Sequence, residues 1–446
     1  MTSRTTRIRA AAVLLTATAL TVSACGGNDP GTDEGAAGEV EGSTIVLTTI
    51  TGLAPQFEQY ADAYMDAFPD RTVEVRSSTD DAAEYSQQLA TGRISGELPD
   101  VFFNVDFLAD TLATNNVTLD LAPGIEEGKL GDLRLDDFLP QFVGQYRPLD
   151  NPEQVTGLPV SADSVGLFYN KTLFDQYGIT EYPEADWTWD DMLRVGEQIT
   201  TASGGDVIGL AAPLGSGADQ IVFGPVIQAF GGFVYDPDTQ TSGIGQPEAI
   251  EAWELMLSAF DSASGPYTAT PDPTVNFNAG NVAMAIASRG GVPQVQATLV
   301  DVDWDVQVLP TIDGNSTAGG GSYGLSIAQT STNQDAAWAF LAWFYDTDAG
   351  MLVAQEVGGA IPPTEDGIDN GIWRDVSPPP ANIAIFGESA RTAVLLTQMP
   401  GATSAVLTEA TTTATQQVIL EGRDVAEAFQ EAEAIVNAAL AEETGE

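Results

Sequence analysis

The sequence predicts an α/β fold with two cores, and three observations support this. Strand-like and helix-like patterns alternate from residue 43 to about 104, and the alternation resumes after Val155. Strands separated by helices favour a mainly parallel sheet covered by helices. A chain of 446 residues, 43% of them hydrophobic, is long enough to fill two sizeable cores.

The first 24 residues have the layout of a secretory signal peptide. Arginines precede an apolar run, Ala10 to Leu20, and small residues stand just before Cys25, the only cysteine. A spanning helix needs about 20 apolar residues, so this run is too short. We expect residues 1–24 to be a signal peptide and residues 25–42, rich in glycine and acid, to be a flexible tether.

The segment that ends in Cys25 resembles a bacterial lipobox. This resemblance implies that the Cys25 thiol is acylated and that the protein is extracytoplasmic, anchored by lipid to the outer face of the cell membrane. The alternative is a plain signal peptide with a chance cysteine. A lone cysteine forms no intramolecular disulfide in either case.

The composition excludes several classes of function. The chain has 15 basic and 64 acidic residues, a formal net charge of −49, and no histidine. Nucleic-acid binding requires Lys and Arg to neutralise phosphates, so we expect no nucleic-acid partner. The absence of histidine removes Ser-His-Asp and Cys-His sites and histidine-based zinc hydrolases. We expect no metal and no cofactor.

The first part of the chain reads as strands and helices in alternation. A β-branched run starts at Ser43, and a later stretch has apolar residues at Phe57, Tyr60, Ala61 and Tyr64, the spacing of one helix face. The expected elements are strands at 43–47, 72–75 and 100–104 and helices at 55–68 and 81–94.

The second part continues the alternation and ends in helices. Thr188 is expected to cap a helix to about Thr201, because acids follow it in the first turn. We expect strands at 165–169, 207–211 and 323–328, helices at 219–230, 247–260 and 333–345, and helical structure over 381–443 with breaks near Pro400 and Gly422.

An alternating stretch near residue 303 predicts one further strand. Asp301, Asp303 and Asp305 alternate with apolar residues, which places the acids together on one exposed face. The glycine of a calcium-binding loop is missing, so we prefer the half-exposed strand to a calcium site. We assign no structure to residues 366–380.

Short motifs occur in order along the chain. They are Leu98-Pro99-Asp100-Val101-Phe102, Gly157-Leu158-Pro159, Leu167 to Phe174, Thr188-Trp189-Asp190-Asp191-Met192, Phe277 to Met284 and Ile361-Pro362-Pro363-Thr364. Together this series resembles the extracellular solute-binding proteins of ABC sugar importers, the maltose-binding-protein-like group. The resemblance covers roughly residues 43 to 440.

The resemblance implies a two-lobe fold of the periplasmic-binding-protein type (type II), with a hinge and a cleft between the lobes. Residues 43–162 plus 322–348 would form the N-terminal lobe. Residues 163–321 plus 349–446 would form the C-terminal lobe. Ligands favour clefts at strand carboxyl ends and domain interfaces, and closure around the ligand is a hinge motion.

The implied function is that of a substrate-binding protein without catalytic activity. It would be a monomer that binds a mono- or oligosaccharide or a polyol, delivers it to the membrane subunits of an ABC transporter, and contacts the membrane through its lipid anchor only. The resemblance and the strand ends point to these ligand contacts: Thr51, Asp80, Asn104, Asp106, Asp163, Phe223, Arg289, Gly321, Ser322 and Tyr323.

The sequence departs from the family pattern at the stacking aromatics. Ile221, Val222 and Gly224 replace most of them on one helix, and Ser288 to Gly291 holds none. Sugar rings pack on aromatic faces, so this loss disfavours long maltodextrins.

Two alternatives stay open at this point. Arg289 carries a planar five-donor group that suits a carboxylate or phosphate, so the ligand could be a charged derivative such as a sugar acid or glycerol phosphate. The less favoured alternative is a secreted glycoside hydrolase that uses two carboxylates.

Overall fold

The computed structural model describes residues 40, 42–214, 219–267, 272–401 and 403–444. These residues fall within one compact unit, 37–446. Cys25, the predicted signal peptide and most of the tether lie outside the described residues. Within the described ranges, no helix combines the length and the apolar character that crossing a membrane requires.

The first sheet has five strands in the order β2-β1-β3-β12-β4. Their bounds are β1 Thr44–Thr49, β2 Thr72–Ser77, β3 Val101–Val105, β4 Leu158–Pro159 and β12 Tyr323–Ile327. β1 pairs in parallel with β2 and β3, as the β-α-β-α-β order predicts. β12 returns late in the sequence and pairs antiparallel with β3 and β4. A late segment therefore completes the early sheet.

Helices pack around this sheet and close the first core. They are α1 Ala54–Ala67, α2 Ala82–Ser95, α3 Ala109–Thr114, α4 Ala122–Glu126, α5 Pro140–Gly144, α11 Gln334–Tyr345 and α12 Gly350–Gly358. Tyr64 of α1 contacts Phe340 and Trp343 of α11 edge to face, at 5.2 Å between ring centroids. Met351 and Ala354 of α12 belong to the same core. The chain therefore stays with the first sheet beyond residue 349, where the sequence placed the last crossing.

The second sheet is mixed rather than mainly parallel. Its order is β13-β11-β5-β9-β6, and β10 also pairs with β5. The bounds are β5 Asp163–Asn170, β6 Ile208–Leu210, β9 Val282–Ser288, β10 Trp304–Gln307, β11 Gly319–Gly321 and β13 Val394–Leu395. β5 is antiparallel to all three of its neighbours. The expected parallel arrangement holds for β6 with β9 and for β11 with β13.

Two of the three glycines of β11 are explained by close approach of neighbouring backbone. A Cβ atom at Gly319 would overlap the carbonyl oxygen of Ile221, and one at Gly320 would lie 2.6 Å from the carbonyl oxygen of Asp163. Only glycine fits there, so the Gly-rich stretch serves packing between strands and a helix.

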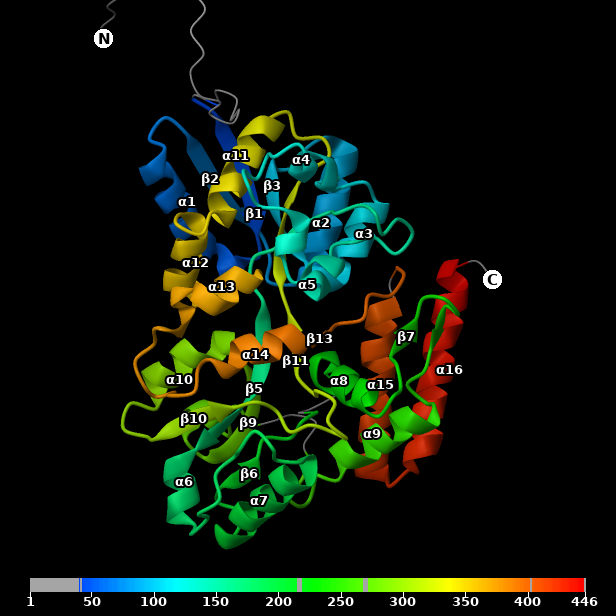
Figure 1. Cartoon of the computed structure of the whole chain (residues 1–446). Helices are drawn as coiled ribbons and strands as arrows, with labels where there is room; N and C mark the ends of the chain where they lie inside the picture. Colours follow the sequence, from blue (N-terminus) through cyan, green and yellow to red (C-terminus); the bar gives the residue numbers. More distant parts are fainter. Residues whose placement is uncertain (1–39, 41, 215–218, 268–271, 402, 445–446) are drawn as a thin grey trace, which may run out of the picture. The chain divides into compact units, whose positions relative to one another are not determined.

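The second core lies between that sheet and a set of helices. They are α6 Lys171–Gln176, α7 Trp189–Ala202, α8 Gln220–Ala229, α9 Pro247–Leu257, α15 Thr403–Glu421 and α16 Val425–Thr444. Figure 1 shows α15 and α16 side by side at the end of the chain. Trp253 of α9 stacks on Phe429 of α16 at 4.1 Å. Two short strands, β7 Tyr235–Asp236 and β8 Thr241–Ser242, form a hairpin beside α16.

The Thr188 cap is confirmed. Its hydroxyl accepts a hydrogen bond from the Asp191 amide, and the Asp191 carboxylate accepts one from the Thr188 amide. This reciprocal pair fixes the start of α7.

A third cluster packs on the other face of β5, includes the segment left unassigned from the sequence, and corrects one expectation. The segment 366–380 contributes α13 Glu365–Asn370 and the buried Trp373, and α10 Val292–Thr298 and α14 Ile385–Thr392 pack beside it. The stretch after 381 is therefore not helical throughout, because β13 interrupts it.

Asp301 and Asp303 are exposed as expected, but Asp305 is buried, so the expected exposed face is wrong for Asp305. Its carboxylate pairs with Lys171 Nζ at 2.9 Å and accepts hydrogen bonds from the amides of Ala381 and Asn382. A buried carboxylate requires such partners, and only the tertiary fold supplies them.

Candidate functional site

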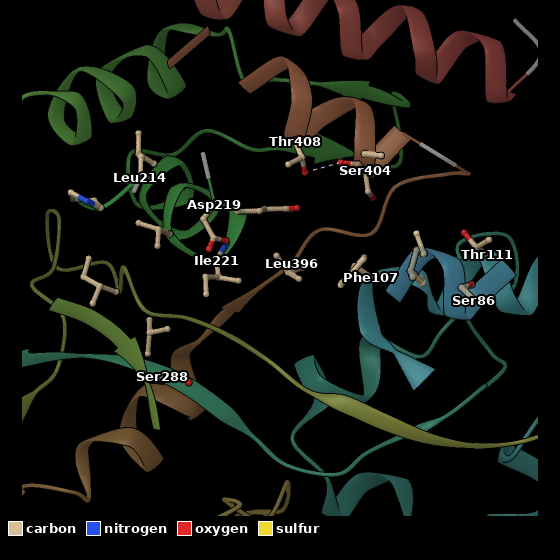
Figure 2. A pocket seen from close by; sticks show the side chains of 18 of the residues that line it. Ser86, Phe107, Thr111, Leu214, Asp219, Ile221, Ser288, Leu396, Ser404 and Thr408 are labelled. Carbon is tan, nitrogen blue, oxygen red and sulfur yellow. Dashed lines mark hydrogen bonds between the residues drawn. The ribbon is translucent and has the colours of Figure 1, made fainter. Parts of the chain in front are cut away.

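Helices beside the first sheet, together with strands and helices of the second half, line a pocket of about 1070 Å³. Figure 2 shows Ser86, Phe107 and Thr111 on one side and Leu214, Asp219 and Ile221 on the other, with Leu396 between them. The first group comes from the helices beside β3, and the second follows β6 and begins α8. The pocket therefore lies where the two halves of the fold face each other.

The first wall is a helical surface with hydroxyl and amide groups. Ser86 and Gln87 stand on α2, Thr111 on α3, and Asn115 at its end. Phe107 lies in the one-turn helix η2 Asp106–Leu108 and is 37% exposed. Of the described residues that line the pocket, Phe107 alone is aromatic.

The opposite wall is mostly aliphatic. Ile221 and Val222 stand in the first turn of α8 and are half-buried. Ala211, Ala212, Pro213 and Leu214 follow β6. Asp219, the one ionisable residue among the described lining residues, accepts a hydrogen bond from the Ile221 amide at 3.1 Å and so caps α8.

The floor combines strand ends and the helix α15. Ser288 at the end of β9, Leu396 after β13, and Ser404 and Thr408 on α15 complete the lining. Ser404 and Thr408 are one helical turn apart and hydrogen-bonded, as Figure 2 shows. None of the ligand contacts predicted from the sequence is among the described lining residues, although several are their neighbours.

Asp106 and Ser322 connect the end of β3 to the crossing segment before β12. The Asp106 carboxylate accepts hydrogen bonds from the amides of Phe107 at 2.8 Å and Ser322 at 3.2 Å. Burial raises the pKa of Asp106 to about 6, and these amide hydrogen bonds only partly offset it. The Tyr146 hydroxyl donates to the Ser322 carbonyl at 2.6 Å. The structure therefore brings Asp106 and Ser322 together as a buried junction behind Phe107.

Three other predicted contacts surround this junction. A Cβ at Gly321 would lie 3.1 Å from the Asp106 carboxylate. Asn104 is fully buried and donates to the Ser326 hydroxyl at 2.9 Å. Tyr323 is 46% exposed and its ring lies 4.8 Å from that of Phe103. Of these three, Tyr323 is exposed, Gly321 is half-buried and Asn104 is buried.

Asp163 begins β5 and Arg289 follows β9, and the two lie near each other without forming an ion pair. Burial raises the pKa of Asp163, and a hydrogen bond from the Ser288 hydroxyl opposes this rise most strongly. The same cause lowers the pKa of Arg289, while the charge of Asp163 partly offsets the effect. Asp163 is therefore hydrogen-bonded to Ser288, a residue that lines the pocket.

Arg289 is 3% exposed and lies under the loop that follows α12. Its guanidinium donates to the Trp373 carbonyl at 3.2 Å, and a Cβ at Gly359 would lie 2.5 Å from Nη1. Among the residues described, no carboxylate comes within 4.0 Å of it. Arg289 is packed inside the fold rather than presented to the pocket.

The remaining predicted contacts lie apart from the pocket. The Thr51 amide donates to the Thr79 carbonyl at 2.9 Å, and the amide of its neighbour Gly52 donates to the exposed Asp80 carboxylate at 2.5 Å. Phe223 is 1% exposed and packs on Trp253, because the helical period turns it inward. The described residues include no group of three or more acids placed to hold a metal ion.

Residues 49–351 match the family of bacterial extracellular solute-binding proteins. The chain belongs to this family. The match spans most of the first sheet, the second sheet up to β11, and the return strand β12. It ends where α12 begins.

Two curated relatives are 27% and 24% identical to this chain over the aligned residues. The chain is 27% identical over 222 residues to a maltotriose-binding protein of Pyrococcus abyssi, covering 47% of this chain and 44% of that protein. It is 24% identical over 366 residues to a lactose-binding protein of Rhizobium radiobacter, covering 76% and 82%. The chain spans about half the length of most of the curated relatives it matches.

Solved structures support the two-lobe type II fold. An ABC substrate-binding protein from Listeria monocytogenes, solved with cycloalternan, aligns with a TM-score of 0.75 at 22% identity. The alignment covers 89% of this solute-binding protein and 99% of that chain.

The ligand contacts predicted from the sequence include none of the described lining residues, but local sequence patterns indicate some of those residues. Ile221 and Val222 stood out because they replace aromatics, and they do line the pocket. Ser404 and Thr408 share a helix face by their spacing, which a reading of α15 could have found. Leu396 offered no local signal, because its place depends on β13 pairing with β11.

Proposed function

We propose that this solute-binding protein serves an ABC importer by holding a carbohydrate in the pocket between its two sheets. The observation that carries the proposal is the pocket itself, which takes its walls from both halves of a fold that closes by hinge motion in periplasmic binding proteins. Family membership supports the extracellular, non-catalytic setting. The protein acts as a monomer and presents its closed form to the transporter's membrane subunits.

The two lobes are built around the two sheets. The N-terminal lobe takes residues 43–162 and 322–348, and α12 extends it because Met351 packs in the first core. The C-terminal lobe takes residues 163–321 and the chain beyond α12. The Asp106–Ser322 junction lies at the crossing between them.

Acylation of Cys25 holds the protein at the outer face of the membrane. A flexible tether over residues 25–42 would let the lobes reach the importer. Contact with the membrane runs through this anchor only.

A neutral sugar or polyol fits the lining better than an anion does. The described lining residues include no Lys or Arg, and Arg289 is packed under the loop after α12. A glycoside hydrolase needs two carboxylates across the ligand. Asp219 is the one carboxylate in the described lining, and it caps α8.

A thermal-shift panel tests the proposal. It compares neutral mono- and oligosaccharides, polyols, sugar acids and phosphorylated polyols. A ligand at 100 times its dissociation constant adds about 2.7 kcal/mol of stability, which is readily measured. We expect neutral compounds to stabilise the protein. Stabilisation by anions alone would reject the neutral-sugar proposal.

A further inference from the structure

The two walls of the pocket differ in chemistry. The wall after β6 and on α8 presents branched aliphatic groups, chiefly Ile221 and Val222, with Leu396 beside them, while Leu214 lines it as a buried core residue. Ile221, Val222 and Leu396 are only half-buried without a ligand, so part of their apolar surface meets water. Exposed apolar surface that gathers in one concave place marks a binding site.

The opposite wall is mixed, with hydroxyl and amide side chains beside Ala83, Ala90 and Leu108. Ser86 and Gln87 on α2 and Thr111 on α3 offer hydroxyl and amide groups. Figure 2 shows Ser86 and Thr111 on the far side of Phe107 and Leu396 from Ile221 and Leu214. A ligand that spans the pocket therefore meets more hydroxyl and amide groups at the α2 and α3 end. It meets more aliphatic surface at the α8 end, where Asp219 and Gln220 are the polar lining residues among those described.

A plain sugar does not match the aliphatic wall. Sugar rings present flat apolar faces, which pack on flat aromatic rings, and Phe107 is the one aromatic among the described lining residues. Branched aliphatic side chains instead bury alkyl groups, at about 0.8 kcal/mol for each methylene removed from water. The pocket of about 1070 Å³ lies at the upper end of the range for drug-sized ligands.

We infer that the ligand is an amphipathic glycoside, in which a glycosyl group carries an apolar substituent longer than methyl. The glycosyl group lies toward α2 and α3, and the substituent lies against Ile221, Leu214 and Leu396. This inference rests on the proposed carbohydrate function and specifies its substrate class.

The test is calorimetric titration with methyl, butyl and hexyl β-D-glucopyranosides and the matching maltosides, all below micelle-forming concentrations. A fully buried methylene raises affinity about threefold to fourfold. We expect affinity to rise at least about tenfold from the methyl to the hexyl compound, since even partial burial of five methylenes supplies that much. Hexan-1-ol at the same concentrations measures binding of the alkyl chain alone.

A matched pair of variants locates the effect. Ile221→Ser removes a branched side chain from the aliphatic wall and is expected to reduce the gain from methyl to hexyl. Val300→Ser makes a similar change at a residue that is 75% exposed and does not line the pocket, and it is expected to keep the full gain.

The outcomes separate this inference from the broader function. Binding of free sugars or methyl glycosides without a gain from the alkyl chain overturns the amphipathic ligand and leaves the carbohydrate function standing. Hexan-1-ol binding as tightly as hexyl glucoside, with no free sugar bound, overturns the carbohydrate function. Lack of binding by every compound overturns both, and an undiminished gain in Ile221→Ser overturns the assigned wall.

Discussion

The carboxylate of Asp106 accepts a hydrogen bond from the backbone amide of Ser322 at 3.2 Å, although the two residues are 216 positions apart. The bond joins the end of β3 to the segment in which the chain crosses between the sheets. Asp106 is 4% exposed, and Tyr146 and Tyr323 are the titratable groups whose pKa values its charge raises. Asp106 therefore links β3 to the crossing segment, while its burial disfavours the ionised form of its carboxyl group.

Asp106→Asn is expected to flatten the dependence of stability on pH. Burial raises the pKa of Asp106 from 3.8 to about 6, so between these values the folded state binds a proton that the unfolded state has released. Stability consequently falls as pH rises through this window, by on the order of 3 kcal/mol. Urea unfolding at intervals from pH 4 to pH 8 measures the slope. Asp62→Asn on the exposed face of α1 controls for loss of one charge, and an unchanged slope in Asp106→Asn would contradict the prediction.

Gly359→Ala is expected to destabilise the protein more than Gly96→Ala does. Both glycines end helices with positive φ, 62° and 78°, so each alanine costs about 1–2 kcal/mol of backbone strain. At Gly359 the new Cβ would also lie 2.5 Å from Arg289 Nη1, whereas nothing lies within 4 Å at Gly96. Overpacking adds about 1–3 kcal/mol. Equal losses of unfolding free energy in the two variants, measured by urea unfolding, would show that the Arg289 side chain moves aside without an energetic cost.

Ser288→Ala and Asp163→Asn are expected to weaken ligand binding in a non-additive way. Ser288 lines the pocket, and its hydroxyl hydrogen-bonds to Asp163, which holds it in place. Each change should cost about 1–2 kcal/mol of binding free energy, with a coupling of at least about 0.5 kcal/mol in the double variant. Titration with the best ligand of the panel measures both. Ser258→Ala, at an exposed site after α9, is the control. Additive losses would place Asp163 in contact with the ligand by itself.

Cys25→Ser is expected to release the protein from the membrane. The thiol is the predicted site of acylation, and without acyl chains nothing in the described residues is long and apolar enough to span a bilayer. Fractionation of cells, together with incorporation of labelled palmitate, measures the effect. Retention of the variant in the membrane fraction would reject the lipid anchor.

Local sequence patterns determined the helices and strands that are specified by the residues within and next to them. The helices at α1, α2 and α7 follow from apolar spacing and caps, such as Thr188 with Asp191. The strands β1, β2 and β3 follow from β-branched runs and their parallel order from the helices between them. The family motifs extended this reading to two lobes with a cleft.

Only the tertiary structure decided which side chains face that cleft. Asp305 looked exposed by its alternation, but contacts with Lys171 and the segment after Pro380 bury it. Phe223 lay beside Ile221 and Val222 in sequence, yet the helix turns it onto Trp253. Ser86, Leu214 and Ser404 all line the pocket, although more than half of the chain lies between the first and the last of them in sequence. Their proximity depends on strand pairings between distant segments, and no local pattern encodes those pairings.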